Sequence, residues 1–537
     1  MDKSLKERLK NPLPWIPIAI AVVFVIGVFV GSRLFPVRDT SDSRTKLENV
    51  LQLIETQYVE EVDVDSLLEA AIPAIIEGLD PHSSYLTGTD LQEANDELGG
   101  SFSGIGISFQ IMNDTVTVVE VISGGPAEKA GVLAGDRIVT VNDSVAAGRG
   151  WNESKVRSTL RGPQGSEVTL GIRRLTSNKT LTFKLKRGQI PVNSVDAAYM
   201  MPGKTGYIKV NKFGSQTYSE FLQSLVSLKR EGAESFVVDL RGNGGGYMEP
   251  AILMVNEFLP KDALIVAVRG RMPGYDSATS ADGSGSFQDV PLTVLIDEYS
   301  ASASEIFAGA IQDNDRGTIL GRRSFGKGLV QKQTDLPDGS ALRLTVARYY
   351  TPSGRCIQKS YTLGHAADYN DELYSRYLSG ELYSADSARI DRSNVFHTIS
   401  GREVFGGGGI MPDIFVANDT TEITNYYLNV MNAGLFQKFA FRWCDNNRAA
   451  IKSVKTMEAL EKILPSDDQL LESFVNFAQA NGIAPRWYYI NISRNLIVSY
   501  LKALIARDVI NVEAFYRVTN ARDAVVKRAL EELQKQQ

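Results

Sequence analysis

The fold of this chain is decided by a stretch that joins an apolar run, a serine-rich turn and a helix: Pro291-Leu-Thr-Val-Leu-Ile-Asp297-Glu-Tyr-Ser300-Ala-Ser302-Ala-Ser304-Glu305-Ile-Phe-Ala-Gly-Ala-Ile-Gln312. The apolar run predicts a buried strand. Another short strand is expected at Thr318–Gly321, before Lys327, which lies between two glycines. A strand that turns sharply into a helix presents backbone N–H groups and a hydroxyl at one point, where the helix dipole favours negative charge. The stretch therefore contains a candidate nucleophile and a candidate base.

The composition is that of a globular protein with several domains. The length of 537 residues predicts roughly three or four domains at ~150 residues each, and 43% hydrophobic and 22% charged residues are ordinary. The net charge of -6, without a long Lys/Arg run, argues against a nucleic-acid partner. The cysteines, Cys356 and Cys444, are expected to be free thiols, with one disulfide as the alternative. Because no Cys/His cluster accompanies them, we expect no metal and no cofactor.

The N-terminal residues predict a membrane anchor. The segment 11–32 carries no charge and is rich in Ile, Val and Phe, and ~20 apolar residues span a bilayer core. Basic residues precede it, which predicts residues 1–12 in the cytoplasm, an anchor at 13–35 and the rest on the periplasmic side of an inner membrane. A cleavable signal peptide is the alternative, but the apolar run is long and no Ala-x-Ala site follows.

Two regions of different periodicity follow the anchor. Residues 40–98 are predicted to be helical, because apolar residues recur at three- and four-residue spacing, with a loop at Leu79–Leu86. From Gly99 the apolar period becomes that of short strands, with short helices at Gly125–Ala130 and Trp151–Leu160. The order of these elements resembles a PDZ domain over residues 99–190, as do two motifs, Gly104-Ile-Gly-Ile107 and Ala134-Gly-Asp-Arg-Ile138.

The resemblance implies that this domain binds peptides. In PDZ domains the backbone of a Gly-Φ-Gly-Φ loop captures the terminal carboxylate of a peptide, which adds as a strand to the sheet edge. Here that loop consists of Gly104, Ile105, Gly106 and Ile107. Arg137 could contact the carboxylate, and a surface salt bridge is the equal alternative. A plain β-barrel module whose glycines only shape a turn is the second interpretation of the domain.

Residues 191–416 predict an α/β domain, because strands and helices alternate along them. The predicted strand Ser235–Leu240 ends in a glycine cluster, Arg241-Gly-Asn-Gly-Gly-Gly246, at the strand end where α/β sheets place their sites. Adjacent glycines favour a close approach of the backbone to a ligand over a merely flexible turn. Segments 270–288 and 361–400 are expected to be a mobile loop and an irregular insertion.

The motif Gly321-Arg-Arg-Ser-Phe-Gly-Lys-Gly328 fits the first seven positions of a P-loop, Gly-x4-Gly-Lys. Three observations argue against a nucleotide site: Gly328 replaces the Ser or Thr that would hold Mg²⁺, the residues after it alternate like a strand, and an extracytoplasmic domain lacks nucleotide. The second hypothesis makes Lys327 a base, which requires a dry, apolar pocket that lowers its pKa. Strand alternation predicts Gln331 on the same face, where a neutral amide can orient the amine.

A Ser-His-Asp triad would need one of only three histidines, His82, His365 and His397. His82 lies in the predicted loop at 79–86, where we expect a structural role for it. A serine activated by a lysine needs none of them, which agrees with their scarcity.

Over about residues 40–415 the chain is similar to the carboxyl-terminal processing peptidases, or tail-specific proteases. In that family the middle serine of Ser-Ala-Ser-Ala-Ser is the nucleophile, which implies Ser302 here, with Lys327 as base and Gln331 as its partner. The family comparison also implies an oxyanion hole formed by backbone N–H groups of Ala303 and of a glycine in the 244–246 turn, Gly245. The resemblance rests on the PDZ-like domain and on four motifs in family order: Asp239-Leu-Arg-Gly-Asn-Gly-Gly-Gly246, Ser300-Ala-Ser-Ala-Ser304, Phe325-Gly-Lys-Gly-Leu-Val-Gln331 and Gly409-Ile-Met-Pro-Asp413.

The sequence as a whole predicts a multidomain α+β protein. Its expected parts are an α/β peptidase core with an inserted PDZ-like β-rich domain, a helical N-terminal region, an N-terminal transmembrane helix and a helical C-terminal extension over 417–537. The expected function is a membrane-anchored serine endopeptidase that binds protein or peptide substrates by their free C-termini. The C-terminal helices could also mediate self-association. The alternative is a non-catalytic PDZ scaffold on a peptidase-like fold.

Overall fold

The computed structural model describes residues 21–24 and 42–536, apart from 175, 176, 178, 385, 386 and 388–392. It consists of two units, one through Ile75 and one from Ile76 onward. Helix α3 (Asp42–Gln57) belongs to the first unit, and helix α4 (Val64–Glu77) ends at the start of the second. The helical prediction for this region is therefore confirmed.

The predicted membrane anchor at 13–35 lies outside the described residues, except for 21–24. No helix in the described part of the chain has the length and the apolar character needed to cross a membrane.

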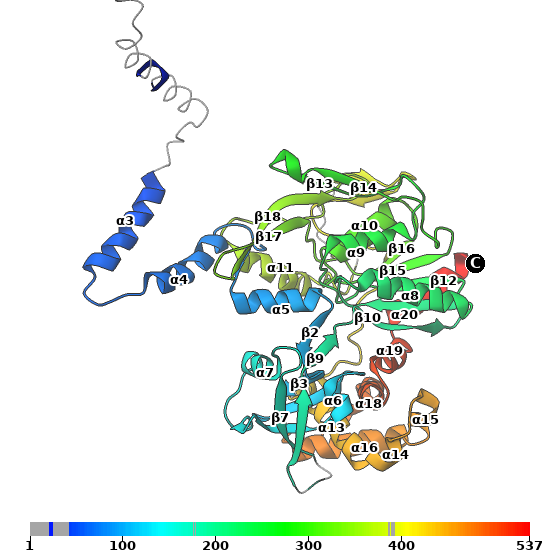
Figure 1. Cartoon of the computed structure of the whole chain (residues 1–537). Coiled ribbons are helices and arrows are strands. Elements are labelled where there is room, and N and C mark those ends of the chain that lie inside the picture. Colours follow the sequence, from blue (N-terminus) through cyan, green and yellow to red (C-terminus); the bar gives the residue numbers. More distant parts are fainter. Residues whose placement is uncertain are drawn as a thin grey trace, which may run out of the picture. The chain divides into compact units, whose positions relative to one another are not determined.

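The centre of the second unit is a six-stranded sheet with the order β10-β11-β12-β15-β16-β21 (Figure 1). The pair β10–β11 is antiparallel and the other neighbours are parallel. The strands are β10 (Val195–Met201), β11 (Thr205–Val210), β12 (Ser235–Asp239), β15 (Leu292–Ile296), β16 (Thr318–Gly321) and β21 (Ile414–Phe415). The predicted α/β alternation is confirmed.

Alternation along these strands gives the sheet two apolar faces. Phe236 and Val238 of β12 pack in the cluster that includes helices α8 (Thr217–Arg230), α9 (Met248–Asn256) and α10 (Ala303–Asp313). Val237 points to the opposite face, where helix α20 (Ala524–Gln536) buries Val525, Val526, Ala529 and Leu533. Helix α19 (Val512–Asn520) lies against β10. A buried parallel sheet needs cover on both faces, and the end of the chain supplies the second cover.

A second sheet carries the segment that follows Lys327. Its strands are β1 (Ser84–Leu86), β13 (Leu264–Gly270), β14 (Ser277–Ser280), β17 (Leu329–Asp335) and β18 (Ala341–Tyr350). Strand β1 ends the predicted loop at 79–86 and pairs with β18, although the whole PDZ-like domain separates them in sequence. That domain is therefore an insertion in the α/β core. The strand after Lys327 also confirms that this segment does not open a helix, as a P-loop would.

The described residues of two segments, predicted to be a mobile loop and an irregular insertion, contain regular secondary structure, which the sequence did not predict. The segment 270–288 contains a turn of 3-10 helix, η2 (Pro273–Tyr275), and strand β14, which pairs with β13. The segment 361–400 contains helix α11 (Ala366–Leu378) and strand β19 (Val395–His397), which pairs with β20 (Glu403–Phe405). Polar composition suggested disorder, but Tyr369 and Arg376 of α11 are buried against the core.

The PDZ-like domain has a sheet with the order β3-β4-β5-β7-β8, and β6 pairs with β5. The strands are β3 (Ile107–Ile111), β4 (Val116–Val121), β5 (Arg137–Val141), β6 (Ser144–Val145), β7 (Glu167–Arg173) and β8 (Leu181–Lys186), with helices α6 (Pro126–Ala130) and α7 (Glu153–Leu160). A two-stranded stem, β2 (Ser101–Gly104) with β9 (Gly188–Pro191), precedes and follows them. The continuous strand expected at 104–109 is interrupted, because Gly106 adopts a φ of 79°.

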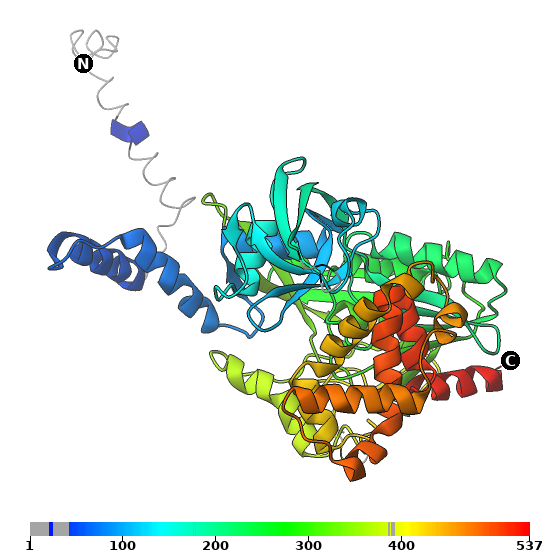
Figure 2. The same ribbon diagram turned by 90° about the horizontal axis from the view of Figure 1, so that it is seen from below.

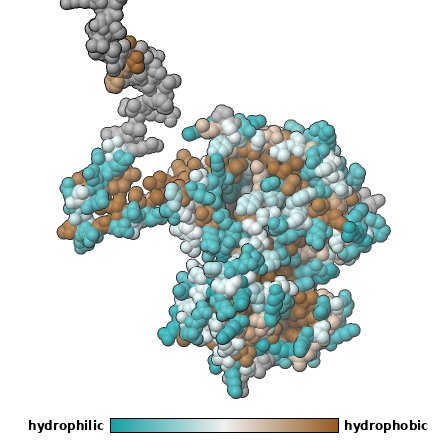
Figure 3. Space-filling model, in the orientation of Figure 1, coloured by the Kyte–Doolittle hydropathy of each residue, from teal (hydrophilic) through white to brown (hydrophobic). Residues whose placement is uncertain are grey.

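The C-terminal extension is helical, as predicted (Figure 2). Helices α12 to α18 surround their own apolar cluster, which includes Ile497, Leu501, Leu504 and Ile505 of the predicted stripe. Their bounds are α12 (Asn425–Asn432), α13 (Leu435–Asn446), α14 (Arg448–Ile451), α15 (Met457–Glu461), α16 (Asp467–Ala480), α17 (Trp487–Ile492) and α18 (Arg494–Val509). The stripe and the apolar face of α20 are therefore packed within the chain. On the face seen in Figure 3, hydrophilic side chains cover most of the second unit.

Candidate active site

The predicted catalytic residues meet in one cleft of about 400 Å³. Ser302 precedes α10, Lys327 precedes β17, and Gln331 lies in β17. Ala303 lines the same cleft, and so do Gly244 and Gly246 of the glycine turn. Residues that lie far apart in sequence and on two different sheets are thus brought together as predicted.

Ser302 has the backbone conformation of a strained turn residue. Its φ of 56° and ψ of -113° lie outside the regions that non-glycine residues ordinarily adopt. Such a conformation costs of order 1–3 kcal/mol and is typical of functional sites. The strained turn holds Ser302 at the N-terminus of α10, where it lines the cleft.

The other two serines of the motif are engaged in buried hydrogen bonds. The Ser300 hydroxyl donates to the Leu240 carbonyl oxygen at 2.9 Å, and the Ser304 hydroxyl donates to the Asn243 carbonyl oxygen at 2.9 Å. Both residues have 0% exposure. They join the serine turn to the glycine turn, which leaves Ser302 as the serine that faces the cleft. The structure thus supplies a local reason for a choice that the sequence left to family resemblance.

The glycine turn approaches Ser302 so closely that a side chain would not fit. Gly245 has a φ of 100°, and a Cβ built on it would lie 2.7 Å from the Ser302 Cβ. The Gly245 N–H, predicted as an oxyanion donor, donates instead to the Asn243 side-chain oxygen at 2.9 Å. In the described residues no protein acceptor is found for the N–H of Ala303 or of Gly246, and both residues line the cleft.

Lys327 has the environment that a neutral amine requires. Burial lowers the pKa of its ammonium, and Arg343 lowers it further, whereas Glu305 and Asp80 raise it. No ion pair of Lys327 is found in the part of the chain that the structure describes. Gln331 donates to the Thr345 hydroxyl at 3.3 Å, which fixes its amide in β17.

Sequence reasoning missed other residues in the cleft. His82, expected to be structural, lines the cleft and bonds the Tyr369 hydroxyl at 2.9 Å. Burial, with Lys327 and Lys359, lowers its pKa to about 4, so it is neutral at neutral pH. Glu305 accepts the Ser302 N–H at 2.8 Å, and the spacing Ser-x-x-Glu of a capping box could have indicated this. Tyr349 gave no local signal, because only β18 brings it to the cleft.

The PDZ-like domain has a peptide-sized groove of about 700 Å³ at the predicted loop. It is lined by Gly104–Phe109, by residues of α7 and by residues of helix α5 (Gly88–Leu98). Within the described part of the chain, β3 pairs with β4 alone, so its other edge is free there. No acceptor is found for the N–H groups of Ile105 and Gly106 among the residues described. These are the features that a peptide carboxylate and an added strand need.

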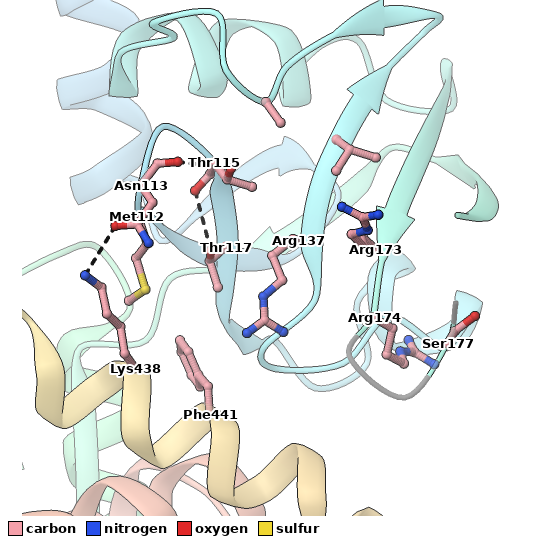
Figure 4. A pocket seen from close by; sticks show the side chains of 12 residues that line it. Met112, Asn113, Thr115, Thr117, Arg137, Arg173, Arg174, Ser177, Lys438 and Phe441 are labelled. Carbon is pink, nitrogen blue, oxygen red and sulfur yellow. Dashed lines mark hydrogen bonds between the residues drawn. The ribbon is translucent and has the colours of Figure 1, made fainter. Parts of the chain in front are cut away.

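Arg137 lies elsewhere, in a hollow of about 540 Å³ between the PDZ-like sheet and α13. Its guanidinium points toward Phe441 of α13 (Figure 4) and donates to Asp445 at 3.0 Å. The structure therefore has the salt bridge and not the carboxylate contact. Arg161 lines the groove and is paired with Asp96 of α5 at 2.9 Å.

Comparisons with known proteins agree with this architecture. Residues 204–370 match the family described as Peptidase family S41, residues 103–186 match the PDZ domain, and residues 35–89 match the activating protease CtpB N-terminal domain. Residues 426–511 match a family of unknown function. These matches define a peptidase with an inserted PDZ domain.

The relatives give the family. The chain is 37% identical over 350 residues to the carboxy-terminal-processing protease of Bartonella bacilliformis, covering 63% of this chain and 80% of that protein. It is 35% identical over 340 residues to a probable CtpA-like serine protease of Staphylococcus aureus, covering 63% and 67%. The solved photosystem II D1 C-terminal processing protease is 31% identical, with a TM-score of 0.33, covering 58% and 84%. The chain belongs to the carboxy-terminal processing protease family of serine-type peptidases.

We expect Gly245→Ala to abolish peptide cleavage. The added Cβ meets the Ser302 Cβ at 2.7 Å at a φ of 100°, so the strain of about 1–3 kcal/mol falls on the serine turn. Gly244→Ala is the control variant, because a Cβ added at Gly244 meets no atom within 4 Å. This variant should lose much less cleavage activity. Cleavage rates of both variants measure the difference, and equal rates would contradict the close approach.

Proposed function

We propose that the chain is a serine endopeptidase in which Ser302 is the nucleophile and Lys327 the general base. The observation that carries the proposal is the cleft itself, which is lined both by a strained serine and by a half-buried lysine for which no carboxylate partner is found among the described residues. A lysine in this environment is more readily neutral than one in water. The cleft of about 400 Å³ has room for an extended peptide segment.

The proposed reaction is acyl transfer in two steps. Neutral Lys327 takes the proton from the Ser302 hydroxyl while the oxygen attacks the scissile carbonyl carbon. The resulting ammonium gives that proton to the leaving amine, and the C–N bond breaks to leave an acyl-enzyme. Lys327 then takes a proton from water, whose oxygen attacks the ester carbon, and the ammonium returns that proton to the Ser302 oxygen as the ester C–O bond breaks and the acid leaves. Gln331 orients the amine throughout.

Backbone donors would stabilise the negative charge on the tetrahedral intermediates. The Ala303 N–H lies at the N-terminus of α10, where the helix dipole also favours an anion. Because the Gly245 N–H is held by Asn243, we propose Gly246 as the donor from the glycine turn. This amends the expectation from the sequence, which named Gly245.

The proposed substrates are proteins with a free C-terminus. The Gly104–Ile107 loop would receive the terminal carboxylate and the free edge of β3 would pair with the tail. Binding of one end of a substrate raises its local concentration at the cleft, which favours cleavage of flexible tails.

Substitution of the dyad tests the peptidase. We expect Ser302→Ala and Lys327→Ala to lower kcat/KM for an unstructured peptide by at least about 10³-fold. Each substitution removes one member of the proposed nucleophile–base pair, which acts as a unit. In the wild type kcat/KM should rise with pH as Lys327 loses its proton, at a pH below the ordinary lysine value because burial lowers this pKa. If both variants cleave like the wild type, the chain is a non-catalytic PDZ scaffold.

Amidation of the substrate tests the role of the PDZ domain. Removal of the terminal carboxylate should lower kcat/KM at least about tenfold, since a hydrogen bond to a charged group contributes about 1.5–3 kcal/mol. Gly106→Ala places a Cβ at a φ of 79° in the loop and should erase the difference between acid and amide peptides. An amide peptide cleaved as fast as the acid by the wild type would contradict tail recognition.

We also propose that residues 13–35 anchor the peptidase to an inner membrane, with its catalytic part outside the cytoplasm. The support is the uncharged apolar run after a basic segment. Deletion of residues 1–38 should move the expressed protein from the membrane fraction to the soluble fraction, whereas deletion of residues 2–10 alone should not. A full-length chain recovered in the soluble fraction would contradict the anchor.

A further inference from the structure

One buried carboxylate binds the backbone of both members of the proposed dyad. Glu305 has 0% exposure, and its Oε2 accepts the N–H of Ser302 and the N–H of Lys327, each at 2.8 Å. Its Oε1 accepts the Ser324 hydroxyl at 2.5 Å and the Gly326 N–H at 2.7 Å. All four donors point at a single side chain, which lies in the first turn of α10.

One phenol binds the same two residues from their carbonyl side. The Tyr349 hydroxyl lies 3.0 Å from the Ser302 carbonyl oxygen and also contacts the Lys327 carbonyl oxygen, and it donates its proton to this pair. Tyr349 is 1% exposed and belongs to β18. Glu305 and Tyr349 therefore bind the same two residues, one on their N–H side and one on their carbonyl side, from two different elements.

Ser302 and Lys327 lie in two loops that leave neighbouring strands, β15 and β16, which pair in parallel. One backbone hydrogen bond joins these loops, from the Phe325 N–H to the Ser300 carbonyl oxygen at 3.0 Å. Among the described residues no backbone hydrogen bond joins Ser302 to Lys327 itself, so the side chains that bind both residues set their final separation. A misplacement of about 1 Å can cost about 10²-fold in rate.

We propose that Glu305 and Tyr349 are positioning residues that fix the separation of Ser302 and Lys327 through their backbones. The proposal rests on the assignment of that dyad as the catalytic pair. Neither side chain is required to exchange a proton with the substrate. Their contribution is geometric, and it should be visible in kcat and not in KM.

The chemistry of the two side chains makes conservative substitutions informative. Glutamine can accept with its one oxygen, but its amide nitrogen would face the donors now bound by Oε1, so two donors would lose their acceptor. Phenylalanine in place of Tyr349 removes only the hydroxyl and keeps the buried ring. Burial raises the pKa of Glu305 to about 7, so protonation in mild acid would disturb the same hydrogen bonds.

The charges around Lys327 allow a pH profile to distinguish a positioning role of Glu305 from a purely structural one. It is faced by Arg343 from β18, Glu305 from α10, and Asp80 and neutral His82 from the segment before β1. Glu305→Gln removes a negative charge that raises the pKa of Lys327, so the acid limb of the kcat/KM profile should move to lower pH. Tyr349→Phe removes no charge and should leave that limb in place.

The test compares four full-length variants on one unstructured peptide substrate. We expect Glu305→Gln and Tyr349→Phe each to lower kcat about 10²-fold with KM within about twofold, and only Glu305→Gln to shift the acid limb. The matched controls are Glu257→Gln and Tyr426→Phe. Glu257 is a buried glutamate that accepts hydrogen bonds from Tyr218 and Ser286, and no partner for the buried Tyr426 hydroxyl is found among the described residues. Both controls should keep wild-type kcat.

Failure of the positioning proposal and failure of the proposed dyad give different results. If Ser302→Ala and Lys327→Ala inactivate the enzyme but Glu305→Gln and Tyr349→Phe behave like the controls, the positioning role is overturned while the dyad stands. If Ser302→Ala or Lys327→Ala remains active, the dyad itself is overturned. Should Glu305→Gln fail to fold, Tyr349→Phe decides alone, and an unchanged kcat for it would overturn the proposal.

Discussion

The parallel pairing of β12 with β15 is the constraint on which the cleft depends. Parallel neighbours end at the same edge of a sheet, so the glycine turn after β12 and the serine turn after β15 leave the sheet side by side. Hydrogen bonds from Ser300 and Ser304 then join the two turns where water does not compete. In this setting a backbone without a side chain is needed at Gly245, because the serine turn occupies the space that a Cβ would take. The strain at Ser302 is maintained by these contacts.

The loop that carries Lys327 is held by single backbone hydrogen bonds, such as that from the Phe325 N–H to the Ser300 carbonyl oxygen, and by charged side chains. The Arg376 guanidinium of α11 donates to the carbonyl oxygens of Ser324 and Phe325, and Arg323 forms an ion pair with Glu381. Helix α11 therefore belongs to the architecture of the cleft, although its composition predicted an irregular insertion. Charged groups buried in this way must be paired, and each pair here fixes one point of the loop before Lys327.

The C-terminal extension joins the PDZ domain and the peptidase core. Helix α13 meets the PDZ domain through Asp445, which pairs with Arg137, and α14 meets it through Arg448, which donates to the Ala134 carbonyl oxygen. Helix α20, at the other end of the extension, covers the outer face of the core sheet. Contacts at both ends give the long extension a structural role within the chain, and they explain why Arg137 is a bridging residue instead of a ligand for a peptide.

The sequence by itself determined the α/β core and the helical extension, and its resemblance to a peptidase family indicated Ser302, Lys327 and Gln331 as candidate site residues. These depend on hydrophobic periodicity and on motifs in which neighbouring residues act together, so a linear pattern is enough. It did not determine that β14 and α11 are ordered, that the Gly245 N–H is already bonded, or that Arg137 faces α13. Nor did it indicate that Tyr349 contacts the carbonyl oxygens of Ser302 and Lys327. Those facts depend on contacts between segments hundreds of residues apart, such as Arg137 with Asp445, and only the tertiary structure decides which buried polar group receives which partner.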